Sequence, residues 1–108
     1  MPLSTLSAER VSQLSALIAE VAGNFSDPEW RAWAEAWLSG AERRSASAIV
    51  AAGIAGAAIE KSPTSLALAM AAFAVADAAA RALIWPGEAD AFIAWANKKV
   101  RTWRELAS

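Results

Sequence analysis

The segment from residue 41 to residue 82 is very rich in alanine, and this constrains the fold more than any other feature. Alanine makes up 18 of its 42 residues, and only seven of the 42 carry a formal charge. Alanine is the strongest helix former, but it covers little apolar area. Such helices must pack at short distances or against bulky residues from elsewhere in the chain or from another chain. The bulk available is six tryptophans, all of which lie outside the segment.

The lack of histidine, cysteine and tyrosine limits the chemistry open to this chain. Without histidine it has neither the commonest general base nor the commonest transition-metal ligand. Without cysteine it has no thiolate nucleophile and no disulfide. Its net charge of −1 over 108 residues predicts no affinity for nucleic acid or an anionic membrane. We therefore expect a single helical domain over residues 1–108 that is not an enzyme, binds no metal and needs no cofactor.

Hydrophobic periodicity and turn residues predict an all-α bundle of about five helices without strands. The first helix, over residues 7–22, has apolar residues at helical spacing and ends at Gly23. The second opens at a capping box, with Ser26 as the cap and Glu29 completing the box. Its apolar stripe consists of Trp30, Trp33 and Trp37. We expect the stripe to fill the core, because alanine-rich helices need bulky neighbours; exposed tryptophans would instead mark a binding hot spot.

The alanine-rich segment is predicted to form a central helical hairpin, over residues 41–60 and 63–84. Both helices are apolar on two sides, which is typical of helices that are buried or self-associate. The face of the first helix that we expect to pack in the core or in an oligomer consists of Ile49, Ala52, Gly56 and Ile59. A small membrane-associated hairpin is the alternative. Against it, the uncharged runs 46–59 and 66–76 are shorter than the ~20 residues that span a bilayer.

A charged residue, Asp77, falls on an apolar stripe of the helix over residues 63–84, where a charge is costly. Arg81 lies one helical turn further on and can pair with it. We expect a buried ion pair that sets helix register or oligomer geometry. A carboxylate with a raised pKa in an enzyme pocket is the alternative, but no histidine or second carboxylate lies nearby in the sequence.

The last predicted helix, over residues 88–106, is the best candidate for a partner surface. Its expected buried stripe consists of Phe92, Trp95, Ala96, Trp103 and Leu106. Lys99 lies one turn from two of these tryptophans, at the spacing of a cation–π stack. Basic residues near a helix C-terminus also stabilise its macrodipole, which is the simpler interpretation. The residues that we expect to contact an acidic partner protein are Lys98, Lys99, Arg101, Trp103 and Arg104.

The stretch WRAWAEAWLSGAERR, residues 30–44, precedes alanine-rich helices. In this it resembles small alanine-rich helical proteins of bacteria that are described as immunity proteins. The resemblance covers residues 28–83. Those proteins often carry histidines in their alanine helices, so any site built on histidine is absent or altered here. The resemblance implies a non-catalytic protein that binds and neutralises another protein.

Together these patterns predict a cytoplasmic protein–protein interaction module of the immunity or inhibitor type that forms a homo-oligomer such as a dimer. The cytoplasmic assignment rests on a start without the basic and apolar regions of a signal peptide. A structural protein that self-assembles through its alanine faces is the main alternative. An enzyme that uses Asp77 with Arg81 is a further one.

Overall fold

The computed structural model describes residues 6–57 and 63–107, and within these ranges the chain forms five α-helices and no strand. The all-α prediction is therefore confirmed. The helices are α1 (Ala8–Ala22), α2 (Pro28–Ser39), α3 (Ser45–Ala57), α4 (Pro63–Ile84) and α5 (Ala89–Ala107), with a short 3-10 helix, η1 (Pro86–Glu88), before the last.

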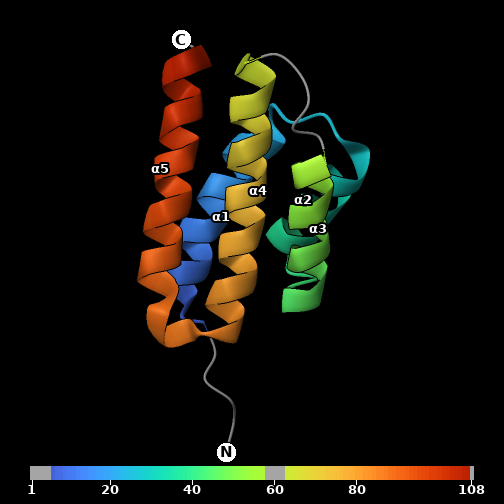
Figure 1. Cartoon of the computed structure of the whole chain (residues 1–108). Coiled ribbons are helices and arrows are strands. Elements are labelled where there is room, and N and C mark those ends of the chain that lie inside the picture. The colour runs from blue at the N-terminus through green and yellow to red at the C-terminus, as the bar shows by residue number, and fades with distance from the viewer. Residues whose placement is uncertain (1–5, 58–62, 108) are drawn as a thin grey trace, which may run out of the picture.

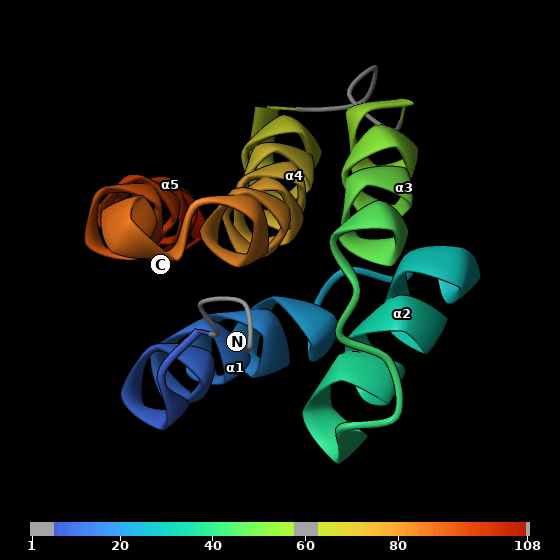
Figure 2. The same ribbon diagram turned by 90° about the horizontal axis from the view of Figure 1, so that it is seen from below.

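The helices form two layers (Figures 1 and 2). Helices α3, α4 and α5 lie side by side in one layer, with α4 in the middle, and α1 and α2 cover one side of it. Because α4 runs antiparallel to its two neighbours, short connections suffice within this layer. Helix α1 contacts α2, α4 and α5, whereas α2 contacts α1 and α3. The core lies between the two layers.

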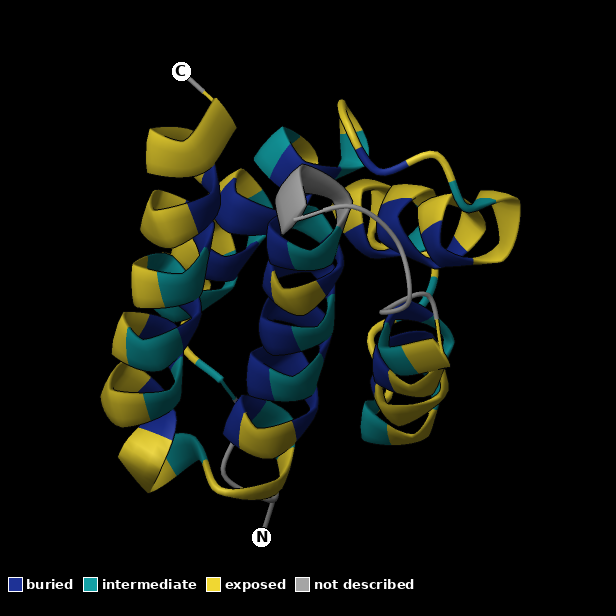
Figure 3. Ribbon diagram, turned by 45° about the horizontal axis from the view of Figure 1, so that its top comes forward, coloured by how far each residue is buried: buried dark blue, intermediate teal, exposed yellow. Residues whose placement is uncertain are grey.

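Helix α4 is the centre of the bundle and is covered on almost every side (Figure 3). Its small side chains let α1, α3 and α5 approach its backbone closely, as expected for an alanine-rich helix. Ten of its alanines are buried: Ala67, Ala69, Ala71, Ala72, Ala74, Ala76, Ala78, Ala79, Ala80 and Ala82. The prediction that this helix is central is thus confirmed.

Helix α3 has a similar composition but lies at the edge of the layer, which the sequence did not indicate. One side, formed by Ala48, Ala51, Ala52 and Ala55, is buried. On the other sides Ile49 and Val50 are 52% and 63% exposed. The sequence predicts helices that are buried or self-associate; this chain encloses α4, whereas α3 is buried on one side only.

The tryptophan stripe of α2 is buried, so its assignment to the core is confirmed. Trp30 and Trp33 meet edge to face and Trp33 and Trp37 at a tilt, with ring centroids 5.5 and 6.0 Å apart. The indole Nε1 of Trp37 donates a hydrogen bond to Ser15 Oγ of α1 at 3.1 Å. These rings supply the side-chain volume that the alanine-rich helices lack.

The starts of α2 and α3 differ from the prediction. The cap of α2 is Asp27 rather than Ser26: its carboxylate accepts hydrogen bonds from the backbone N–H groups of Glu29 and Trp30. Helix α3 begins at residue 45, not 41. Gly40 takes a left-handed conformation, with φ of 83°, and ends α2. The next residues are then held outside a helix, where the Glu42 carboxylate accepts hydrogen bonds from the backbone and side chain of Arg44.

The length argument against a membrane span does not hold for α4. Among the described residues, its stretch Leu66–Ile84, 19 residues long, is the one helical segment that is long and apolar enough to cross a membrane by length and composition alone. The length argument counted only uncharged runs, and the charged residues at 77 and 81 interrupt this stretch. In this structure most of the stretch is buried against α1, α3 and α5, as the central helix of a bundle is.

Candidate functional site

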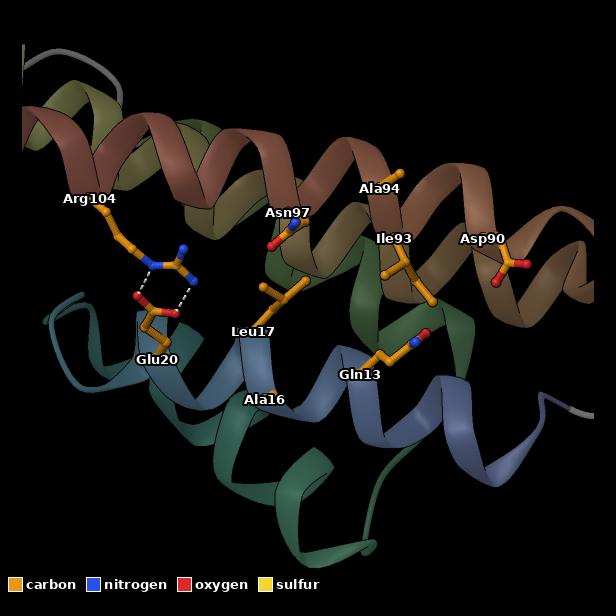
Figure 4. Close-up of a pocket in the computed structure, with 9 residues that line it drawn as sticks. All are labelled: Gln13, Ala16, Leu17, Glu20, Asp90, Ile93, Ala94, Asn97 and Arg104. Atoms are coloured by element: carbon orange, nitrogen blue, oxygen red, sulfur yellow. Dashed lines mark hydrogen bonds and ion pairs between the residues drawn. The ribbon is translucent and has the colours of Figure 1, made fainter.

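A hollow of about 510 Å³ lies between α1 and α5, and we call it the α1–α5 groove (Figure 4). The two helices meet here along one seam and run in the same direction. The lining residues are Gln13, Ala16, Leu17 and Glu20 from α1, and Asp90, Ile93, Ala94, Asn97 and Arg104 from α5.

Each end of the groove is closed by an arginine–carboxylate pair between the two helices. At one end Arg104 donates from Nε and Nη2 to the two carboxylate oxygens of Glu20, at 2.5 and 2.6 Å. At the other end Arg10 donates from Nε and Nη2 to the two oxygens of Asp90, both at 2.8 Å. Such two-point contacts set the relative position of two helices more strictly than a single bond does. The pairs therefore connect α1 and α5 at both ends of the groove.

These pairs also lower the pKa values of both carboxyl groups. The hydrogen bonds from Arg104 lower the pKa of Glu20, although partial burial acts in the opposite direction. The hydrogen bonds from Arg10 lower the pKa of Asp90 in the same way. Both groups are therefore ionised at neutral pH and bound to their arginines, so neither is available as a general acid.

Between the two ends the groove has an apolar floor and polar sides. Leu17 and Ile93 are buried at its base. The amide side chains of Gln13 and Asn97 reach from the two helices toward the space between them (Figure 4). Neither amide has a hydrogen-bond partner within the described ranges, so both can bond to a ligand or to water. An apolar base with a few orienting polar groups is the usual composition of a binding site.

The basic cluster predicted on α5 does not form one surface. Lys98 and Arg101 are exposed, whereas Lys99 is half-buried beside α4 and Arg104 is paired with Glu20. Because successive residues are about 100° apart around a helix, neighbours in the sequence point to different sides. Trp103 is buried in the core, which contradicts its prediction as a partner contact.

The buried stripe predicted for α5 is also partly wrong. The structure buries Ala89, Ile93, Ala96, Val100 and Trp103. Phe92 and Trp95 are half-buried and Leu106 is exposed. These large residues lie on the side of α5 that borders α4 and is open to solvent, not on the side that faces the core. Among the described residues, Lys99 makes no cation–π contact, contrary to the prediction. A cation–π contact occurs instead at Arg43, whose guanidinium lies 5.7 Å from the ring centre of Trp37.

The predicted ion pair on α4 forms, but it is not buried. Arg81 Nε donates to Asp77 Oδ2 at 2.8 Å. The Asp77 side chain is 19% exposed and that of Arg81 is 50% exposed, because this side of α4 faces the open groove between α4 and α5. The pair lines a hollow of about 260 Å³ together with Phe92 and Trp95.

Of the four residues predicted to form one packing face of α3, the structure describes three, and they differ in burial. Ala52 is buried. Gly56 is half-buried, and a Cβ placed there would lie 3.9 Å from Phe73 Cδ1 of α4. Ile49 is exposed, and Ile59 lies outside the described residues. The two small residues therefore serve contacts within the chain, whereas Ile49, at the edge of the same side of α3, is exposed.

A metal site or a catalytic cluster is not evident in the described part of the chain. Within it, no group of three or more Asp and Glu residues is placed to hold a metal ion. The fold and the groove together define a small all-α bundle with an open groove between two parallel helices. Comparisons with protein-family models, with curated proteins and with solved structures gave no match to this chain.

Proposed function

We propose that this protein is a non-enzymatic binding protein, of the inhibitor or immunity type, that holds a segment of another protein in the α1–α5 groove. The observation that carries the proposal is the composition of the groove: an apolar base, two amides without a hydrogen-bond partner among the described residues, and an ion pair at each end. Its carboxylates are bound to arginines and it contains no nucleophile with a nearby base, so it is suited to binding rather than to chemistry.

A peptide segment fits this groove better than a charged ligand does. Each guanidinium at the groove ends is matched by a carboxylate, so the groove has no excess charge for an acidic partner. From Asp90 to Arg104 it extends over 14 residues of α5, or about 21 Å at 1.5 Å per residue, which is the length of a short helix or an extended segment. Amide side chains offer both a donor and an acceptor, as peptide groups do.

The proposal can be tested by filling the groove without disturbing the core. Ala16 and Ala94 are exposed alanines on its two walls, so a tryptophan at either position occupies the groove. The matched control is Ala46→Trp, since Ala46 is also an exposed helical alanine but lies on α3. The tagged protein is used to capture partners from the cells that produce it, and affinity for the captured protein is then measured by calorimetry.

We expect the wild type and Ala46→Trp to capture the same protein with equal affinity. Ala16→Trp and Ala94→Trp should bind it at least tenfold more weakly, with circular dichroism spectra that match the wild type. Equal binding by all four proteins would show that the groove is not the site. Capture of no protein by the wild type would contradict the function itself.

A further inference from the structure

Helix α3 presents an apolar stripe to solvent that has no role in the proposed function. Of the helices in the described ranges, α3 alone contains no charged residue. Its exposed positions lie within an arc of about 100°, on the side opposite its buried alanines. We call these positions the α3 stripe: Ala46, Ile49, Val50, Gly53 and Ala57. An apolar stripe of this width is typical of a helix that packs against another helix.

The α1–α5 groove is suited to a helix rather than to an extended segment. Both of its walls are helices, whose backbone groups are bonded within each helix. Between its paired ends, the hydrogen-bonding groups that it offers are the amides of Gln13 and Asn97. An extended segment would bury backbone N–H and C=O groups that these two side chains cannot all satisfy, which is costly. A helix satisfies its own backbone groups and needs only a matching surface.

The α3 stripe matches the groove in length, charge and shape. Helix α3 has 13 residues and is about 20 Å long, whereas the groove extends over about 21 Å. The arginines at the groove ends are paired with carboxylates, so a charged occupant would find no free counter-charge, and α3 brings no charge. A Cβ at Gly53 would have nothing within 4 Å, and Ala16 and Ala94 on the groove walls are exposed. Small residues on both surfaces allow the helices to approach closely.

The stripe and the groove cannot meet within one molecule. Helices α3 and α5 lie on opposite sides of α4 (Figure 1), and the groove lies on the α1 side of α5, away from α3 (Figure 2). Within the described ranges α3 contacts only α2 and α4. A contact between a stripe and a groove therefore joins two copies and leaves one stripe and one groove free. Such an interface is head to tail rather than two-fold.

We propose that the α3 stripe of one copy of this chain occupies the α1–α5 groove of the next, in a head-to-tail self-association. The inference deepens the proposed function, because it rests on the same groove and names a helix that fits it. One face of α3 covers an area about 20 Å long and 10 Å wide, much less than the ~800 Å² per partner that stable interfaces bury. The self-association is therefore weak: measurements at micromolar concentration observe the monomer, and a tightly bound partner protein displaces α3.

A pair of variants tests the contact, because each removes a different half of it. Val50→Asp places a charge on the stripe at a position that is 63% exposed, and Ala94→Trp fills the groove. In sedimentation equilibrium at millimolar concentration, the average mass of the wild type should exceed 11.3 kDa and rise with concentration. Each variant alone should stay monomeric. An equal mixture of the two should form a heterodimer, because one groove and one stripe remain intact.

The matched control is Thr102→Asp, which adds the same charge at an exposed position of α5 outside both surfaces. It should associate as the wild type does. A second pair, Ile49→Asp with Ala16→Trp, repeats the test if either first variant fails to give the circular dichroism spectrum of the wild type. A monomeric wild type at millimolar concentration, or a mixture that stays monomeric, would overturn the inference.

Nuclear magnetic resonance locates the contact in the same mixture. When isotope-labelled Val50→Asp is titrated with unlabelled Ala94→Trp, the side-chain amide signals of Gln13 and Asn97 should shift, because the labelled copy supplies the groove. With the labels exchanged, the backbone signals of α3 should shift instead. Shifts confined to other surfaces of either copy would overturn the inference.

The self-association and the proposed function can fail separately. Val50→Asp keeps the groove, so it should capture the partner protein as the wild type does while it loses self-association. Self-association without capture of another protein would contradict the proposed function alone. Capture that depends on the groove, by a protein that stays monomeric at millimolar concentration, would contradict the inference alone.

Discussion

Helices α3 and α4 are built from nearly the same residues, yet they occupy very different positions. Both are rich in alanine and carry few charges, and both are apolar around their circumference. Helix α4 is enclosed by three neighbours, whereas α3 contacts α2 and α4 and exposes Ile49 and Val50. Composition therefore determines that these segments are helical, but the number of neighbours determines what each alanine contributes to stability.

We expect the largest effect on stability when a buried alanine is replaced by a larger residue. Ala79→Leu on α4 adds a bulky group where the wild-type residue is fully buried. We expect a loss of about 3 kcal/mol or failure to fold, because the surrounding backbones cannot move apart cheaply. The same change on the exposed side of α3, Ala46→Leu, should cost less than about 0.5 kcal/mol. Urea denaturation monitored by circular dichroism measures both values, and equal losses would contradict the comparison.

Helix α3 should also gain stability from changes that remove its glycines. A Cβ at Gly53 meets nothing within 4 Å, and one at Gly56 makes an ordinary contact with Phe73. Replacing either residue by alanine should stabilise the protein by about 0.5–1 kcal/mol, because glycine is the poorer helix former. A loss of stability in Gly56→Ala would show that α3 packs on α4 more closely than the structure indicates. Thermal denaturation of the two single variants provides the measurement.

The seam between α1 and α5 carries two arginine–carboxylate pairs above its apolar base, so part of its stability should respond to pH. The pKa values of Glu20 and Asp90 are lowered in the folded state by their arginines, and that of Glu42 is lowered to about 2 by Arg44. Such carboxylates contribute stability above their unfolded pKa values and lose it as the pH falls through the folded ones.

We therefore expect the melting temperature to decrease as the pH falls from about 5 toward 2. Glu20→Gln should flatten part of this dependence. At neutral pH it should cost only about 0.5 kcal/mol, since exposed ion pairs contribute little. Melting curves of the wild type and Glu20→Gln across this pH range test the expectation. A melting temperature that rises on acidification would contradict it.

The smallest effect is expected on the exposed side of α3. Ile49→Ser removes an apolar side chain that is about half exposed, so the change in unfolding free energy should be within about 0.5 kcal/mol. A large loss would indicate that this side of α3 is covered in solution. Urea denaturation at two protein concentrations separates the two cases, because only a covered face makes stability depend on concentration.

Most of the secondary structure could be predicted because its signals are local. Ser7 caps α1 and accepts a hydrogen bond from the Arg10 backbone N–H, Gly23 follows the last residue of α1, and Pro63 begins α4. The start of α3 was predicted wrongly, since a favourable composition over residues 41–44 did not reveal that Gly40 and Glu42 hold the chain outside a helix.

The α1–α5 groove could not be predicted, because its parts are distant in the sequence. Arg10 and Asp90 are 80 residues apart, and Glu20 and Arg104 are 84 residues apart. Each of these residues is an ordinary charge on an exposed helix side when its own segment is considered alone. Only the parallel arrangement of α1 and α5 brings them together, and no local pattern encodes that arrangement.

By itself the sequence determined that this chain is a helical bundle, that its central helix is alanine-rich and that the tryptophans of α2 belong to the core. These properties follow from helix propensity, periodicity and the need to fill volume, which act over a few turns. The tertiary structure alone decided which alanine helix is enclosed, which side of α5 faces solvent and which charges pair. The physical reason is that periodicity defines the faces of a helix, whereas packing selects the neighbour of each face.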